Sequence, residues 1–143
     1  MLGETFTDSN GMKHHGVLGM KWGVRRASKK YQKLINKAKS NIYSKSNSRY
    51  INAYNKTADE YNNGKIEAFN KKNNSKSSKY IEKYNKAFEK DFNKNYNKML
   101  FDDITKDKNY IKAEQVSKKY GLESVDKFVQ GQHQTIKDLQ KLF

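Results

Sequence analysis

Apolar side chains recur every three or four residues over much of the chain, which is the period of an amphipathic α-helix. The clearest pattern is an aromatic stripe between about 79 and 100, with spacings of 3, 4, 4, 4 and 3 residues: Ile81, Tyr84, Phe88, Phe92, Tyr96 and Met99. Six lysines lie off this stripe, at positions 79, 83, 86, 90, 94 and 98. We expect a helix here, with the aromatic stripe as a buried seam between helices. A surface on which nucleic-acid bases stack is the alternative.

Two weaker stripes precede this helix. The first predicts a helix from about Ala27, with Ser28 as its N-cap, and consists of Tyr31, Ile35, Ala38 and Ile42. The second follows the polar stretch 44–48 and consists of Tyr50, Tyr54, Ala58 and Tyr61. The sequence Asn62-Asn63-Gly64 then predicts a helix stop, and residues 73–78 have the composition of a linker.

Two further helices are expected at about 106–120 and 123–142, with Gly121 ending the first of them. We expect Asp102 and Asp103 to cap the helix at 106–120. The chain contains no proline, so helices can run long without interruption. The pattern therefore predicts an all-α fold of extended helices and helical hairpins, without a sheet.

The N-terminal residues lack this periodicity. We expect residues 1–12 to form a flexible arm and residues 13–26, the docking segment, to be irregular because Gly16, Gly19 and Gly23 oppose a helix. The expected organisation is then a helical segment at 27–72, the linker at 73–78, and a helical region at 79–143, with helices at about 79–100, 106–120 and 123–142.

Composition adds a strong positive charge to this picture. The chain has 143 residues, only 34% of them hydrophobic, and a formal net charge of +15. Residues 13–98 hold 22 of the 30 basic residues and only 6 of the 15 acidic ones. Such a block attracts phosphate and acidic surfaces. The alternative is that part of the charge reflects codon bias, because the codons of an AT-rich genome favour lysine and asparagine. Because little apolar surface is available, we expect partner chains to provide part of the burial.

Recognisable catalytic chemistry is missing from the sequence. There is no cysteine, no phosphate-binding glycine loop, no GxSxG and no HExxH. His14 and His15 are adjacent and point apart in regular structure, and His133 is distant in sequence. We therefore expect no enzyme activity, no cofactor and no metal, and the lack of a long apolar run argues against a membrane partner.

The docking segment carries the sharpest local signal. Trp22, the only tryptophan, lies among glycines and is followed by the only arginine pair, Arg25 and Arg26. Tryptophan and arginine dominate the energetics of protein interfaces, and glycine lets a backbone approach a partner closely. The alternative is that Trp22 packs on the chain's own helices.

Residues 14–26, HHGVLGMKWGVRR, resemble the HHGxLGMKWGxRR segment of head-associated proteins (minor head or capsid-associated) of tailed phages of Gram-positive hosts. The resemblance covers 13 of 143 residues and implies a place in the virion, with host cytoplasm as the site of assembly. It supplies no catalytic residues.

From this resemblance and the residues together we expect a structural phage head protein that docks on a capsid or portal protein. The docking residues would be His14, His15, Val17, Leu18, Met20, Trp22, Arg25 and Arg26. Further copies of the chain would pack through the aromatic stripe, and the basic helices would face packaged DNA or neighbouring subunits. Two alternatives remain: a DNA-binding or anti-defence protein ejected with the genome, and a scaffolding or portal-associated assembly factor.

Overall fold

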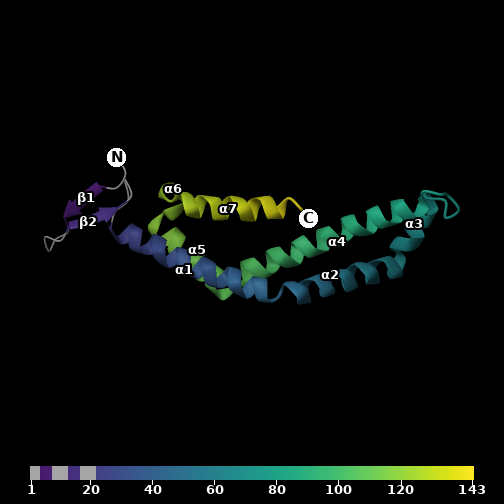
Figure 1. Cartoon of the computed structure of the whole chain (residues 1–143), viewed down its shortest axis with the longest axis horizontal. Coiled ribbons are helices and arrows are strands. Elements are labelled where there is room, and N and C mark those ends of the chain that lie inside the picture. Colours follow the sequence, from purple (N-terminus) through teal and green to yellow (C-terminus); the bar gives the residue numbers. More distant parts are fainter. Residues whose placement is uncertain (1–3, 8–12, 17–21) are drawn as a thin grey trace. The chain divides into compact units, whose positions relative to one another are not determined.

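The structure is a computed structural model of the chain, and it describes residues 4–7, 13–16 and 22–143 (Figure 1). From Trp22 onward the described chain is helical, so the predicted all-α class is confirmed there. The elements are α1 (Trp22–Ser44), α2 (Ser46–Glu60), the π-helical turn η1 (Tyr61–Lys65), α3 (Ile66–Lys72), α4 (Tyr80–Lys106), α5 (Lys108–Tyr120), α6 (Leu122–Val125) and α7 (Lys127–Gln140).

A short hairpin precedes the helices and was not predicted. Strand β1 (Glu4–Thr7) pairs with β2 (Lys13–Gly16) in antiparallel register, with Glu4 opposite Gly16 and Thr7 opposite Lys13. The expectation of no sheet therefore holds for residues 22–143 but not for these strands, which replace part of the predicted flexible arm and part of the irregular docking segment. The sequence did contain a signal, because β-branched and aromatic residues precede an Asn-Gly pair.

The chain divides into two compact units. Unit 1 contains residues Met1–Asn41 and Ile104–Lys137, and unit 2 contains Ile42–Asp103 and Asp138–Phe143. Unit 1 carries 16 basic and 6 acidic residues (net +10), whereas unit 2 carries 14 and 9 (net +5). None of the helices in the described part of the chain has the length and apolarity needed to cross a bilayer.

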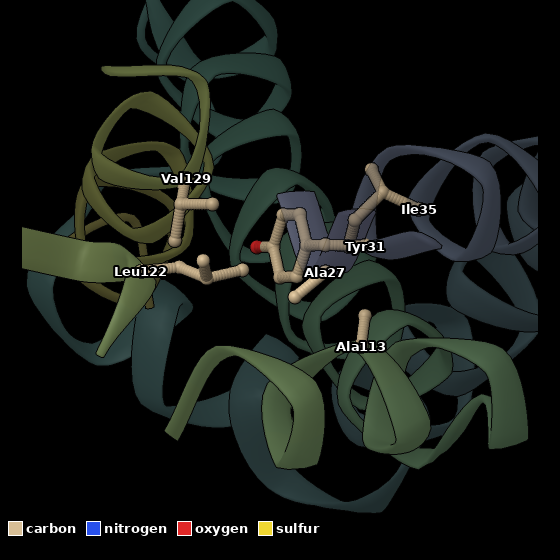
Figure 2. Close-up of a cluster of buried hydrophobic side chains, with 6 residues drawn as sticks. All are labelled: Ala27, Tyr31, Ile35, Ala113, Leu122 and Val129. Carbon is tan, nitrogen blue, oxygen red and sulfur yellow. The ribbon is translucent and has the colours of Figure 1, made fainter. Parts of the chain in front are cut away.

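The core of unit 1 is a small cluster contributed by α1, α5, α6 and α7 (Figure 2). Its buried members are Ala27, Tyr31, Ile35, Ala113, Leu122 and Val129. The Tyr31 ring lies in the middle of the cluster, and its hydroxyl end points toward Leu122 and Val129. Phe128 packs edge-on against the same ring, with 6.2 Å between ring centroids. Tyr31 is thus the side chain around which unit 1 is packed.

Aspartates set the helix starts in unit 1, although not the ones predicted. Asp107 accepts hydrogen bonds from the backbone N–H groups of Asn109 and Tyr110 and so caps α5. The predicted caps, Asp102 and Asp103, lie inside α4, because that helix continues to Lys106. The α5 helix ends as predicted at Gly121, which has the left-handed φ of 61°.

Asp126 interrupts the helix predicted at 123–142. Its carboxylate accepts from the N–H groups of Phe128 and Val129 and so caps α7. It also accepts a hydrogen bond from the Ser28 hydroxyl. Ser28 itself is not an N-cap, because α1 begins six residues earlier, at Trp22. The hydroxyl instead connects the second turn of α1 to the start of α7.

In unit 2 the aromatic stripe of α4 packs on the chain's own α2, η1 and α3. Neighbouring rings have centroid separations of 5.0 Å for Tyr50–Phe92, 5.5 Å for Tyr54–Phe88, 5.2 Å for Tyr61–Phe88 and 5.6 Å for Phe69–Tyr84. The stripe is therefore a seam within the chain, but it is half-buried where a buried seam was predicted, since α4 has no fully buried residue. The packing of further copies on it stays a prediction. Tyr96 lies beside Phe92, and Met99 is half-buried. Ile81 is 71% exposed and lies outside the seam.

The buried face of α2 differs from the predicted one. Its buried residues are Arg49, Ala53 and Thr57. In contrast, Tyr50 is 56% exposed and Tyr54 is 50% exposed. The Tyr50 and Tyr54 rings contact Phe92 and Phe88 of α4 from these more exposed positions. The polar groups are satisfied: Arg49 Nε donates to Asp103 at 2.9 Å, and Asn95 donates to Thr57 Oγ1 at 3.0 Å.

The predicted stop at 62–64 is a kink and not an end. Gly64 has φ of 137°, a value that favours glycine, and Asn63 is also non-helical. Helical turns nevertheless continue on both sides of the kink, to Lys72. The Tyr61 hydroxyl fixes the turn by donating to Asp91 at 2.7 Å, and burial followed by this bond raises the pKa of Tyr61 above its usual value of 10.

Candidate docking site

The described residues of the docking segment fall on two elements. Lys13–Gly16, which includes His14 and His15, forms strand β2, and Trp22, Arg25 and Arg26 occupy the first turns of α1. The predicted docking residues Val17, Leu18 and Met20 lie outside the described residues. The expectation that residues 13–26 are irregular is therefore wrong for 13–16 and 22–26.

Gly23 lies inside α1, where sequence reasoning expected it to prevent a helix. A glycine costs about 1 kcal/mol relative to alanine in a helix interior. The cost is offset locally because Val24 and Ala27 pack into the core of unit 1. A Cβ added at Gly23 would meet nothing within 4 Å. The described part of the fold therefore does not require glycine at this position.

Trp22 and Arg25 form one compact unit on the first turn of α1. The Arg25 guanidinium carbon lies 5.1 Å from the centroid of the Trp22 ring, in cation–π geometry. Residues three apart share a helix face, so this contact follows from their spacing. Such a contact contributes about 0.5–1 kcal/mol at an exposed site. Both side chains are half-buried.

Arg25 also has an unused donor. Its Nη1 is shielded from solvent and has no hydrogen-bond acceptor among the described residues. A buried donor without an acceptor costs about 1–3 kcal/mol, and more when it is charged. A partner carboxylate that reached Arg25 would remove this cost. Arg26, one position further, is exposed and belongs to the opposite side of the helix from the core.

The family comparison points to the same stretch. A family model described as "Family of unknown function (DUF7211)" matches residues 9–29. No curated protein and no solved structure matches the chain. The match encloses the whole docking segment and the first eight residues of α1, and it does not extend to the later helices.

A second polar cluster in unit 1 was missed by sequence reasoning. His133 on α7 lies between two carboxylates, with Nε2 2.9 Å from Glu114 Oε1 and Nδ1 3.2 Å from Glu123 Oε1. Glu114 also accepts a hydrogen bond from the Tyr31 hydroxyl at 3.4 Å. Burial, followed by the charge of Glu114, raises the pKa of Tyr31 above its usual value and that of Tyr110 to about 12.

This cluster lines an open hollow together with Ser117, Lys118 and Ile136. Within residues 22–143 no group of three or more His, Cys, Asp or Glu side chains is arranged to hold a metal ion. The cluster instead ties α5 and α7 to α1, which carries the docking residues. No short sequence motif could have revealed it, because His133 and Glu114 are 19 residues apart on different helices.

Proposed function

We propose that the protein is a structural, non-enzymatic component of a tailed-phage head, assembled in the host cytoplasm and kept in the virion. It docks on a capsid or portal protein through residues 13–26, and its basic helices face packaged DNA or neighbouring subunits. The resemblance of residues 14–26 to the HHGxLGMKWGxRR segment of phage head-associated proteins carries this proposal. The family match over residues 9–29 supports treating that stretch as a recognition unit separate from the helices that follow.

The geometry of α1 supports docking as the mechanism. An interface anchor binds well when its side chains are ordered in advance, because little conformational entropy is then lost on binding. Trp22 and Arg25 meet this condition, since they contact each other on a helix held in the core by Val24 and Ala27. Arg25 Nη1, which has no acceptor within the part of the chain that the structure describes, adds a reason to bind one.

Docking is tested by replacing Trp22 and Arg25 together with alanine and counting copies in purified virions by quantitative mass spectrometry. The matched control is Tyr43→Ala with Lys45→Ala, which also removes one ring and one positive charge at exposed positions. We expect the docking variant to fall at least tenfold relative to the major capsid protein and the control to stay at its normal level. Unchanged copy number in the docking variant, with normal helicity by circular dichroism, would refute docking through this segment.

The same particles separate the two other roles. A scaffolding or portal-associated assembly factor is present in immature heads and absent from mature ones. An ejected DNA-binding protein is present in mature heads and is lost from emptied particles together with the genome. A structural head component remains in the emptied particles, which is the outcome that we expect.

A further inference from the structure

The outward face of α1 carries a continuous positive stripe. Its members follow one another at intervals of 4, 3 and 4 residues: Arg26, Lys30, Lys33 and Lys37. At 3.6 residues per turn these positions fall within about 60° of the helix circumference. All four side chains are exposed, and the exposed Lys29 lies at the edge of this basic stripe.

The opposite face of α1 is the buried one. Ala27, Tyr31, Ile35 and Ala38 lie there, and the first three belong to the core of unit 1. The core therefore fixes the rotation of the helix, and that rotation directs the basic stripe to solvent.

No acidic side chain offsets this charge. Helix α1 carries seven basic residues and no acidic one, whereas α4 carries six lysines and five acids. The four acids between residues 104 and 137 of unit 1 are occupied elsewhere. Asp107 and Asp126 cap helices, and Glu114 and Glu123 contact His133. Within residues 22–143 no carboxylate is paired with a member of the basic stripe.

Like charges three or four residues apart destabilise a helix by about 0.2–0.5 kcal/mol per pair. The basic stripe contains three such neighbouring pairs, from Arg26 to Lys37. The fold thus maintains an arrangement that opposes its own stability, which is what a binding surface for a negatively charged ligand requires.

We infer that the basic stripe of α1 binds the phosphate backbone of duplex DNA without sequence preference. At 1.5 Å per residue the stripe is about 16 Å long. Duplex DNA presents one charge for about every 1.7 Å of its axis, so a stripe of this length faces several phosphates. Lysine, which forms most of the stripe, binds phosphate as a point charge and does not select a base as a bidentate arginine does.

The face lacks what other anionic partners would need. Single-stranded nucleic acid is bound through several aromatic rings on which bases stack. On this face Trp22 precedes Arg26 by one turn, but its ring is already in contact with Arg25, and no aromatic residue lies between Arg26 and Lys37. A helix that binds a membrane surface inserts its apolar side, but the apolar side of α1 is buried in unit 1. The inference deepens the proposed function, from which it takes only the source of the DNA, the packaged genome.

The test uses the purified full chain and a fluorescein-labelled 30-base-pair duplex of mixed sequence, with binding followed by anisotropy from 50 to 300 mM NaCl. The stripe variant replaces Arg26, Lys30, Lys33 and Lys37 with glutamine. The control variant removes four exposed lysines from α4 by the same change: Lys83, Lys90, Lys94 and Lys98. Lysine and glutamine have similar helix propensities, so both variants should keep the helical circular dichroism of the parent.

We expect the stripe variant to lose at least tenfold in affinity at 100 mM NaCl. The slope of log affinity against log salt should become shallower by about 3–4, since each phosphate contact contributes about 0.9. The control should lose less than threefold. Equal losses in the two variants, no binding by the parent at 50 mM NaCl, or tighter binding to a single strand of the same length would overturn the inference.

These outcomes are independent of the head assignment. A chain that is absent from virions but binds duplex through α1 would refute the proposed function and keep the inference. If the chain is present in virions but the stripe and control variants lose DNA affinity equally, the proposed function is kept and the inference is refuted.

Discussion

Removing the Tyr31 ring should show whether unit 1 has a cooperative core of its own. The side chain is fully buried, with an exposed fraction of 0%, and it contacts the Phe128 ring edge-on. Replacing a buried aromatic side chain with alanine costs about 3–5 kcal/mol through lost apolar burial and the cavity that remains. We therefore expect Tyr31→Ala to lower the free energy of unfolding of unit 1 by that amount, a large fraction of the total for a domain of this size.

Tyr31→Phe separates the ring from the hydroxyl. The hydroxyl contributes one long hydrogen bond, 3.4 Å, to Glu114, and that carboxylate keeps His133 as a partner. We expect a loss of about 0.5–1.5 kcal/mol, which is the net value of an ordinary hydrogen bond. The ratio of the two losses thus measures how much of the role of Tyr31 is packing.

Urea unfolding provides the assay, and the chain contains its own probe. Trp22 is the only tryptophan and belongs to unit 1, so its fluorescence follows that unit while circular dichroism follows all helices. Tyr43→Ala is the matched control, because Tyr43 is 82% exposed and its loss should change stability by less than about 0.5 kcal/mol. A loss below about 1 kcal/mol for Tyr31→Ala would contradict the idea that this cluster stabilises unit 1.

Three further predictions concern single positions in unit 1, each measured by urea unfolding. Asp126→Ala should lower the free energy of unfolding by about 1–2 kcal/mol, because two N–H groups of α7 lose their acceptor, whereas Asp126→Asn should keep most of the cap. Gly131→Ala should raise it by about 0.5–1 kcal/mol, because Gly131 is helical and a Cβ there meets nothing within 4 Å; a loss would reveal a contact at that position. The pKa of Tyr110 is raised to about 12, so the folded state keeps a proton that the unfolded chain loses above pH 10. Stability should fall by up to about 1.4 kcal/mol per pH unit from this residue, and Tyr110→Phe should remove that share of the slope between about pH 10 and 12.

The sequence predicted the helices well where one stripe of large apolar residues faced one partner. The stripe from Tyr84 to Phe92 is such a case, because aromatic rings every four residues leave only one face to pack, although no residue of α4 is fully buried. It failed on α2, where the buried positions are Arg49 and Thr57. A polar side chain can be buried when a distant group satisfies it, and Asp103 and Asn95 are 54 and 38 residues away.

The candidate site was predicted only where it depends on residues close together in the sequence. The contact between Trp22 and Arg25 follows from their spacing, once α1 is known to begin at Trp22. The basic stripe could not be recognised, because lysines occur throughout the chain and only the fold shows which acids are already engaged. Asp126, for example, looks in the sequence like a counter-charge for Lys127, but its carboxylate is buried beneath α1 and bonded to Ser28.

Helix α1 combines three tasks that compete for the same residues. Its inner face stabilises unit 1 through Tyr31, its first turn presents Trp22, and its outer face concentrates charges that repel one another. Because burial on the inner face offsets the repulsion on the outer one, the helix can carry an uncompensated charge that an isolated peptide of this composition would not hold as a stable helix. Phosphate bound along Arg26 to Lys37 would screen that repulsion, so duplex DNA should stabilise the unit that binds it by an amount that grows with the logarithm of the DNA concentration once this exceeds Kd. The ligand that we infer for the basic stripe would therefore reduce the repulsion between its charges. Binding of DNA and stability of unit 1 would then be coupled.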